Sequence, residues 1–194
     1  MTEQKTKTLQ DPIQINYVEL DRLLLDSENP RFAGLSKNAS ESEILSKLQK
    51  EMHLDELIDS FEKNGFYNTE PLLAVESKKH EDKFVVIEGN RRLAAIKTLL
   101  KSGKKISEKL KIQLTKQIPI AIYPNRQTLW TYLGFRHING PQEWDSYSKA
   151  VYALRVHKEY KIPIEKIAEK IGDRHLTVIK MCNGLRVLEQ AEKV

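Results

Sequence analysis

Cysteine is almost absent from the sequence, since Cys182 is the only one among 194 residues. A single cysteine excludes an internal disulfide framework and fits a reducing, cytoplasmic compartment. No apolar run approaches the ~20 residues of a membrane-spanning helix, and the polar N-terminal stretch lacks the apolar core of a signal peptide. These absences exclude a disulfide-rich secreted protein and predict that no membrane is a partner.

Aromatic residues are also scarce, at 7%, whereas hydrophobic residues make up 40% and charged residues 30% of the chain. This composition is typical of a soluble globular protein and is too apolar for wholesale disorder. A chain of this length can form one large domain or two small ones with a buried core.

Charge is distributed unevenly along the chain, although the formal net charge is only +5. Residues 1–70 carry 8 basic and 14 acidic side chains, whereas residues 101–126 carry 7 and 1. Residues 149–194 carry 10 basic and 6 acidic side chains. The basic back half favours a polyanionic partner, and a solvated lysine-rich surface is the alternative.

Hydrophobic periodicity predicts an α+β region with a small mixed sheet, followed by an all-helical region. Residues 1–14 are expected to form a flexible tail. The elements expected before residue 126 are a strand at 15–25, a helix at 40–63 ended by Gly65, strands at 70–75 and 84–88, a helix at 90–100, a loop or weak helix at 102–117, and a strand at 118–123. The domains are accordingly predicted at 15–125 and 126–194. In the second, an expected helix at 144–160 carries a stripe of Trp144, Tyr147, Val151, Leu154 and Lys158.

The junction between the strand at 84–88 and the next helix has the composition of an anion site. Gly89 lets a ligand approach the backbone closely, and the first amides of a helix have no intrahelical partner. Arg91 and Arg92 oppose the helix dipole unless an anion lies there, so they are candidates for holding phosphate. The alternative is that both pair with carboxylates such as Glu88. The chain contains neither GxGxxG nor GxxxxGK[ST], which excludes the Rossmann and P-loop motifs.

The stretch EGNRRLAAIK resembles the GERR-type box of the ParB/sulfiredoxin superfamily, which includes the ParB-type partition proteins. Four other stretches follow in the family's order. VELDRLLLDSENPRF resembles its opening strand and Asn-Pro element, FEKNGFYNTEPLLAV its base-contacting element, IPIAIY the strand after the box, and GFRHINGPQEWDSYSKA its second phosphate motif.

This resemblance implies a nucleotide switch that binds CTP or another nucleoside triphosphate with Mg²⁺ and closes two subunits around DNA. The nucleotide-binding residues that it implies are Asn29, Arg31, Gly65, Pro71, Glu88, Gly89, Asn90, Arg91, Arg92, Arg136, His137 and Asn139. It also implies a location at the nucleoid or a plasmid. Asn90 departs from the family's glutamate, and a neutral amide is neither a general base nor a carboxylate metal ligand. The resemblance therefore leaves nucleotide hydrolysis open. No cysteine occurs in the box, which excludes sulfiredoxin chemistry.

Residues 162–188 have the pattern of a helix-turn-helix. Counted from Ile164, small Ala168 stands at position five and Gly172 at the turn, position nine. Apolar side chains occupy the shared-core positions, namely Ile167, Ile171, Val178 and Met181. The second helix is expected from Arg174 to Leu185, with Asp173 as its N-cap and Cys182 as a packing residue. Its outer face would place Arg174, His175, Thr177 and Lys180 against DNA. An ordinary helical hairpin is the alternative.

Three functions are consistent with these features. The first is a DNA-binding protein, acting as a homodimer on double-stranded DNA, whose nucleotide-binding domain controls its helix-turn-helix. The second is a ParB-like nuclease or NTPase in which Glu88 is the catalytic carboxylate. The third is a helix-turn-helix regulator whose nucleotide pocket is degenerate.

Overall fold

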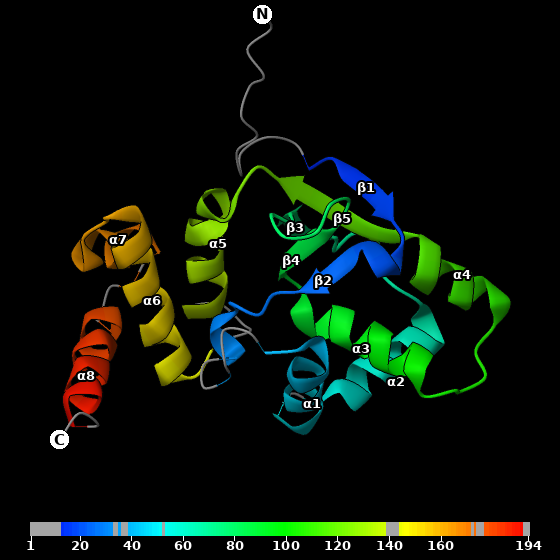
Figure 1. Cartoon of the computed structure of the whole chain (residues 1–194), viewed down its shortest axis with the longest axis horizontal. Helices are drawn as coiled ribbons and strands as arrows, with labels where there is room; N and C mark the ends of the chain where they lie inside the picture. Colours follow the sequence, from blue (N-terminus) through cyan, green and yellow to red (C-terminus); the bar gives the residue numbers. More distant parts are fainter. Residues whose placement is uncertain are drawn as a thin grey trace, which may run out of the picture. The chain divides into compact units, whose positions relative to one another are not determined.

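The computed structural model describes residues 13–32, 35, 39–51, 53–138, 144–171, 173 and 177–191 (Figure 1). The predicted flexible tail lies almost entirely outside these ranges. The chain divides into two compact units. Unit 1 contains Met1–Ser27 and Leu35–Arg126, and unit 2 contains Glu28–Gly34 and Gln127–Val194. The short segment 28–34, which the sequence places with the first domain, is grouped with the helical second unit.

Unit 1 is built on a five-stranded mixed sheet with the order β1-β5-β3-β4-β2. Its strands are β1 (Ile15–Val18), β2 (Leu23–Leu25), β3 (Leu72–Glu76), β4 (Phe84–Glu88) and β5 (Ile118–Tyr123). The pairs β2–β4 and β3–β5 are parallel, and the pairs β1–β5 and β3–β4 are antiparallel. Together with the helices, this sheet confirms the predicted α+β class.

The prediction of one strand at 15–25 is wrong. A short 3₁₀ turn, η1 (Leu20–Arg22), interrupts it and separates two strands. β1 pairs with β5 and β2 pairs with β4, so the two pieces form opposite edges of the sheet. Residues 15–25 therefore supply the strands at both edges of the sheet.

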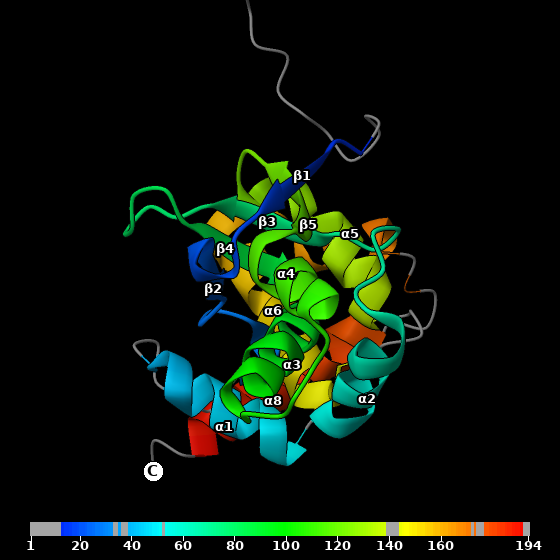
Figure 2. The same ribbon diagram turned by 90° about the vertical axis from the view of Figure 1, so that its right-hand side faces the viewer.

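Helices α1 (Glu41–Glu51), α2 (Leu54–Asn64) and α3 (Asn90–Lys101) lie together on one side of the sheet (Figures 1 and 2). The prediction of one helix at 40–63 is wrong, because His53 takes a left-handed conformation, with φ 45°, between α1 and α2. Leu93, Ala94 and Ile96 of α3 are completely buried. α3 is therefore the central helix of this unit.

The lysine-rich stretch after α3 contains a regular helix, α4 (Glu108–Lys116). Ser107 caps it, because its side chain accepts a hydrogen bond of 3.2 Å from the Leu110 amide. Leu110 and Leu114 are its buried residues. The apolar spacing of these two leucines and the capping serine favour the helical alternative of the sequence prediction.

Unit 2 is helical, as predicted. It contains η2 (Pro30–Phe32), most of α5 (Arg126–Ile138), α6 (Ser146–Tyr160), α7 (Ile164–Lys170) and α8 (Thr177–Ala191). Asp145 caps α6 by accepting a 2.9 Å hydrogen bond from the Ser148 amide. Burial opposes ionisation of this carboxyl, but the hydrogen bonds from Ser148 outweigh it and lower the pKa of Asp145.

The predicted apolar stripe of α6 is wrong. Tyr147 is 49% exposed, and the helix instead buries a face that includes Tyr152, Ala153 and Val156. Tyr152 donates a hydrogen bond to the Trp130 carbonyl, which satisfies its hydroxyl inside the core. This face combines large and small side chains, and the hydrophobic pattern alone did not indicate it.

α8 packs on α6 through Val178, Cys182 and Leu185. Cys182 is fully buried and its Sγ lies 3.9 Å from the Ala150 carbonyl oxygen, which confirms the predicted packing role. Burial raises the pKa of its thiol. Met181, predicted as a core residue, is only half-buried, because the face turned to α6 is centred on Cys182.

Gly134 marks a close approach between α5 and Ile171 within unit 2. A Cβ at this position of α5 would lie 2.5 Å from Cγ2 of Ile171, a stiff and buried β-branched side chain. By contrast, a Cβ at Gly184 of α8 would meet nothing within 4 Å. The two helical glycines therefore differ in steric surroundings and provide a matched pair.

We expect Gly134→Ala to lower the free energy of unfolding by about 1–2 kcal/mol, because the added methyl overpacks the contact with Ile171. Gly184→Ala should raise it by about 0.5–1 kcal/mol, since alanine is the better helix former. Urea unfolding followed by circular dichroism measures both. Equal effects of the two substitutions would contradict this packing.

Candidate functional site

The turn from β4 to α3 is formed by Gly89, which occupies the N-cap position with φ 99°. Gly89 itself has no side chain with which to cap this helix end. A Cβ here would lie 2.5 Å from Cδ2 of Leu72 and 3.0 Å from a terminal nitrogen of Arg92. Both the backbone conformation and the space therefore require glycine. The result is a helix start whose backbone can be approached closely by a ligand.

Asn90, the first residue of α3, is buried and bonds to the backbone at both ends of its amide. Its Oδ1 accepts a 2.9 Å hydrogen bond from the Asp26 amide, and its Nδ2 donates to the Val86 carbonyl at 2.8 Å. This joins the residue after β2 to β4 and to the start of α3. A carboxylate could not donate the second of these bonds.

Arg92 brings two of the stretches that carry the resemblance together within unit 1. It donates a hydrogen bond to the Glu70 carbonyl, lies 3.8 Å from the Glu70 carboxylate, and stands over the Phe66 ring at 5.7 Å. Gly65–Phe66, Glu70–Pro71 and Gly89–Arg92 therefore lie around one guanidinium. Arg92 therefore has an acidic contact in Glu70, which partly matches the ion-pair alternative of the sequence analysis.

Gly65 ends α2 with φ 74°, as expected of the predicted helix stop. A Cβ on it would lie 2.5 Å from Oε1 of Gln113, whose side-chain amide bonds to both backbone groups of Phe66, at 3.2 and 3.0 Å. Gln113 of α4 thus holds the segment that carries Phe66. Sequence reasoning missed this role, because nothing in the local pattern around Gln113 indicates a partner 47 residues away.

The other predicted residues of unit 1 are Pro71, Glu88 and Arg91, and all three are half-buried. Pro71 precedes β3, Glu88 ends β4, and Arg91 follows Asn90 in the first turn of α3. The sequence also missed a buried ion pair next to this region. Asp26 is only 2% exposed and accepts two hydrogen bonds from Arg126, 100 residues away, one of them at 2.8 Å.

The remaining described candidates belong to unit 2. Asn29 precedes η2, and its Oδ1 accepts a 3.0 Å hydrogen bond from the Arg31 amide. Arg136, near the end of α5, donates to the Tyr132 hydroxyl at 3.1 Å. His137 is buried and stacked on Trp144 at 4.5 Å, so the structure gives its ring a packing contact. Asn139 lies outside the described residues.

The helices of the predicted helix-turn-helix are α7 and α8. Ile167 and Ala168 of α7 are buried, and the Asp173 amide donates to the Ala168 carbonyl at 2.9 Å, a bond that closes many helix ends. The Asp173 carboxylate accepts a 2.7 Å bond from the Val178 amide at the start of α8. Thr177 is half-buried in the first turn of α8, and Lys180 is exposed. Gly172, Arg174 and His175 lie outside the described residues.

The described ranges contain neither a candidate metal-binding group nor a candidate membrane-spanning helix. His, Cys, Asp and Glu side chains nowhere gather there in a group of three or more that could hold a metal ion. In the same part of the chain, no helix has both the length and the apolar character needed to cross a membrane.

No family model and no curated protein matches the chain. Among solved structures, it is similar to the C-terminally truncated chromosome-partitioning protein ParB from Caulobacter crescentus complexed to the centromeric parS site, with 14% identity, 86% of this chain and 69% of that chain covered, and a TM-score of 0.48. The same Caulobacter protein complexed with CTP-γ-S covers 87% and 76%, with 14% identity and a TM-score of 0.39.

A third similar structure is sulfiredoxin from Arabidopsis thaliana, with 16% identity, 62% of this chain and 97% of that chain covered, and a TM-score of 0.33. These are the two kinds of protein that the sequence motifs resemble. The sequence identities and TM-scores of these three structures are too low to assign a function to the chain.

We expect Gly89→Ala to lower the free energy of unfolding by about 1–3 kcal/mol, because it adds backbone strain and a collision with Leu72. Gly103→Ala is the control. Gly103 has φ 70°, and a Cβ there would meet nothing within 4 Å, so it should lose only about 1 kcal/mol, from backbone strain. Urea unfolding measures both, and equal losses would show that the close approach of Leu72 is unimportant.

Proposed function

We propose that this chain is a DNA-binding protein in which the α7–α8 helix pair contacts double-stranded DNA and the Gly89 turn binds the phosphates of a nucleoside triphosphate. The nucleotide favours one conformation of the protein over another and thereby changes its affinity for DNA. Two chains act together on a two-fold symmetric site. CTP is the nucleotide implied by the sequence resemblance.

The observation that carries the proposal is the packing of α7 and α8. Ala168 is buried, and its small side chain lets the two helices pack closely. α8 buries Val178, Cys182 and Leu185 in the core. Lys180 is left exposed on the opposite face of α8. A short supporting helix followed by a longer one that exposes a basic side chain in its N-terminal half is consistent with the arrangement that reads the major groove in helix-turn-helix proteins.

The nucleotide half of the proposal is supported by the surroundings of Gly89. The start of α3, where glycine is the N-cap residue, supplies backbone amides and the positive end of the helix dipole. Arg91 lies in the first turn, and Arg92 stands between Phe66 and Glu70. When a phosphate binds, its charge can replace the Glu70 carboxylate, which is 65% exposed and therefore inexpensive to release into water.

The residues around Gly89 fit a phosphate better than a metal ion held by protein ligands. Asn90 uses both ends of its amide on backbone groups, so it supplies no metal ligand in this arrangement. Mg²⁺ commonly binds through nucleotide phosphates and water rather than through an all-protein cage. The protein's part is therefore to place the phosphates by the α3 amides and the arginines, and no hydrolysis is required.

A second candidate is a helix-turn-helix regulator that binds no nucleotide. The contacts of Arg92 with Glu70 favour it, because they provide an anion for this arginine within the chain. Calorimetric titration with CTP, ATP and GTP, each with Mg²⁺, separates the two functions. Heat of binding for one of them supports the switch, and no binding of any at millimolar concentration supports the simple regulator.

We expect Arg91→Gln to weaken binding of the preferred nucleotide about 10- to 100-fold, because it removes a charge-assisted hydrogen bond to phosphate. Lys79→Gln is the control, since it removes one positive charge from an exposed turn of the same unit. Calorimetry measures both variants. An unchanged affinity in Arg91→Gln would place the phosphates elsewhere.

We expect Lys180→Ala to weaken binding to every duplex tested and to lower the slope of log K against log salt by about 1, the signature of one lost phosphate contact. Lys79→Ala should leave both quantities unchanged. Fluorescence anisotropy with labelled duplexes at several salt concentrations measures the effect. If both lysine variants behave alike, α8 is not the DNA-contacting helix.

A further inference from the structure

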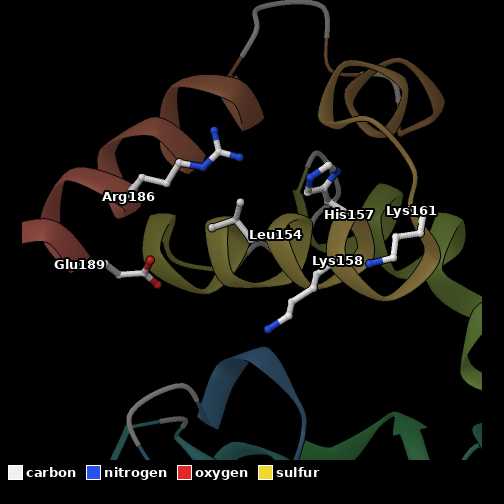
Figure 3. Close-up of a pocket in the computed structure, with 6 residues that line it drawn as sticks. All are labelled: Leu154, His157, Lys158, Lys161, Arg186 and Glu189. Atoms are coloured by element: carbon white, nitrogen blue, oxygen red, sulfur yellow. The ribbon is translucent and has the colours of Figure 1, made fainter.

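Two sets of charged side chains lie outside the residues used above. The first set lines an open cavity of ≈ 540 Å³ beside α6 and α8, where Figure 3 shows Lys158, Lys161 and Arg186 extending in different directions. These cations therefore do not converge on one ligand. The second set surrounds residues 26–28, where the chain leaves unit 1, and its members are bonded to one another.

Asp26 holds the unit 1 side of this crossing. The chain passes from unit 1 to unit 2 after Ser27 and again after Arg126. The Asp26 amide donates a 2.9 Å hydrogen bond to Oδ1 of Asn90, and the Asp26 carboxylate accepts two hydrogen bonds from Arg126, one of them at 2.8 Å. Both crossings therefore adjoin one buried ion pair, and the backbone of that pair is bonded to the first residue of α3.

Glu28 holds the unit 2 side of the crossing through Arg155 of α6. Arg155 donates a hydrogen bond to the Glu28 carbonyl, and a guanidinium nitrogen lies 3.9 Å from a Glu28 carboxylate oxygen. The attachment continues along the chain, because Pro30 and Phe32 of η2 are buried and η2 packs on α6. α6 in turn packs on α8, the helix proposed to contact DNA.

The segment between these two attachments is short. Residues 26–28, here named the connector, place only Ser27 between Asp26 and Glu28. Two residues of backbone span at most about 7 Å. Because both ends are held, the connector has little slack, and a displacement of Asp26 passes to Glu28 and so to Arg155.

The contacts of Asn90 link the connector to the candidate phosphate site. Asn90 follows Gly89 at the start of α3, and the amides of residues 90–92 precede the first intrahelical hydrogen bond, from the Leu93 amide to the Gly89 carbonyl. A phosphate bound by these amides acts directly on Asn90, whose Oδ1 holds the Asp26 amide. Hydrogen bonds and covalent chain thus form one continuous series from the Gly89 turn to α6, on which α8 packs.

Building on the proposed function, we propose that the connector transmits occupancy of the Gly89 turn to α8, with Asp26 and Arg155 as positioning residues at its two ends. Neither residue contacts nucleotide or DNA in this scheme. The connector instead supplies the coupling free energy between the two binding sites. Loss of one attachment therefore uncouples the two affinities without abolishing either of them.

The test is the ratio of the DNA dissociation constants of the full chain without and with saturating CTP and Mg²⁺, or with ATP or GTP where calorimetry shows that one of these binds instead. Fluorescence anisotropy with a labelled duplex measures both constants. We expect the two constants to differ at least fivefold in the parent and less than twofold in Arg155→Gln. The side chains of Arg155 and Glu28 are 27% and 53% exposed, so this variant should fold. Lys158→Gln removes the same charge from an exposed position of the same helix and should keep the parent ratio.

A second variant changes the length of the connector and leaves its contacts unaltered. Two glycines inserted after Ser27 add about 7 Å of slack and should also remove the difference between the two DNA constants. Nucleotide and DNA should each still bind within about threefold of the parent. The same insertion after Lys79, in the exposed turn between β3 and β4, is the control and should keep the parent ratio. Circular dichroism checks that each variant is folded, and Arg155→Gln decides alone if the insertion prevents folding.

The outcomes separate the connector from the function on which it depends. A parent ratio that persists in either folded variant would overturn the role of the connector and leave the proposed function in place. A parent chain that binds no nucleotide, or whose affinity for DNA is the same with and without it, would overturn the proposed function and the connector together.

Discussion

The side-chain amide of Asn90 is the interaction on which the candidate nucleotide site depends. It accepts from the Asp26 amide and donates to the Val86 carbonyl, so one buried group joins the end of β2, the strand β4 and the first residue of α3. The left-handed turn at Gly89 immediately before it then begins α3 directly after β4. Asp26 in turn is neutralised by Arg126, which makes its burial tolerable.

Much of the fold could be predicted, because it follows from local patterns. Alternation and apolar runs predicted β4 and β5, and the Gly89 junction predicted the start of α3. The predictions that were wrong have physical explanations. His53 breaks a helix without glycine or proline, and Tyr147 is exposed because α6 buries a different face, which includes Tyr152 and Val156. Contacts such as Asp26–Arg126 join residues 100 apart, and no local pattern indicates them.

The two units divide the chemistry that the sequence suggests. Unit 1 carries the Gly89 turn with Arg92, Phe66 and Glu70 around it, and unit 2 carries the α7–α8 helix pair. The proposed phosphate site therefore rests on the start of a helix in unit 1, where the first backbone amides lack intrahelical partners.

The most direct test of the account is amide hydrogen exchange of the full chain with and without the four ribonucleoside triphosphates and Mg²⁺. The account predicts that the nucleotides protect the amides of residues 90–92, which precede the first intrahelical hydrogen bond of α3, from the Leu93 amide to the Gly89 carbonyl. Protection that is absent there while nucleotide binds elsewhere in the chain would contradict the central claim that the Gly89 turn is the phosphate site.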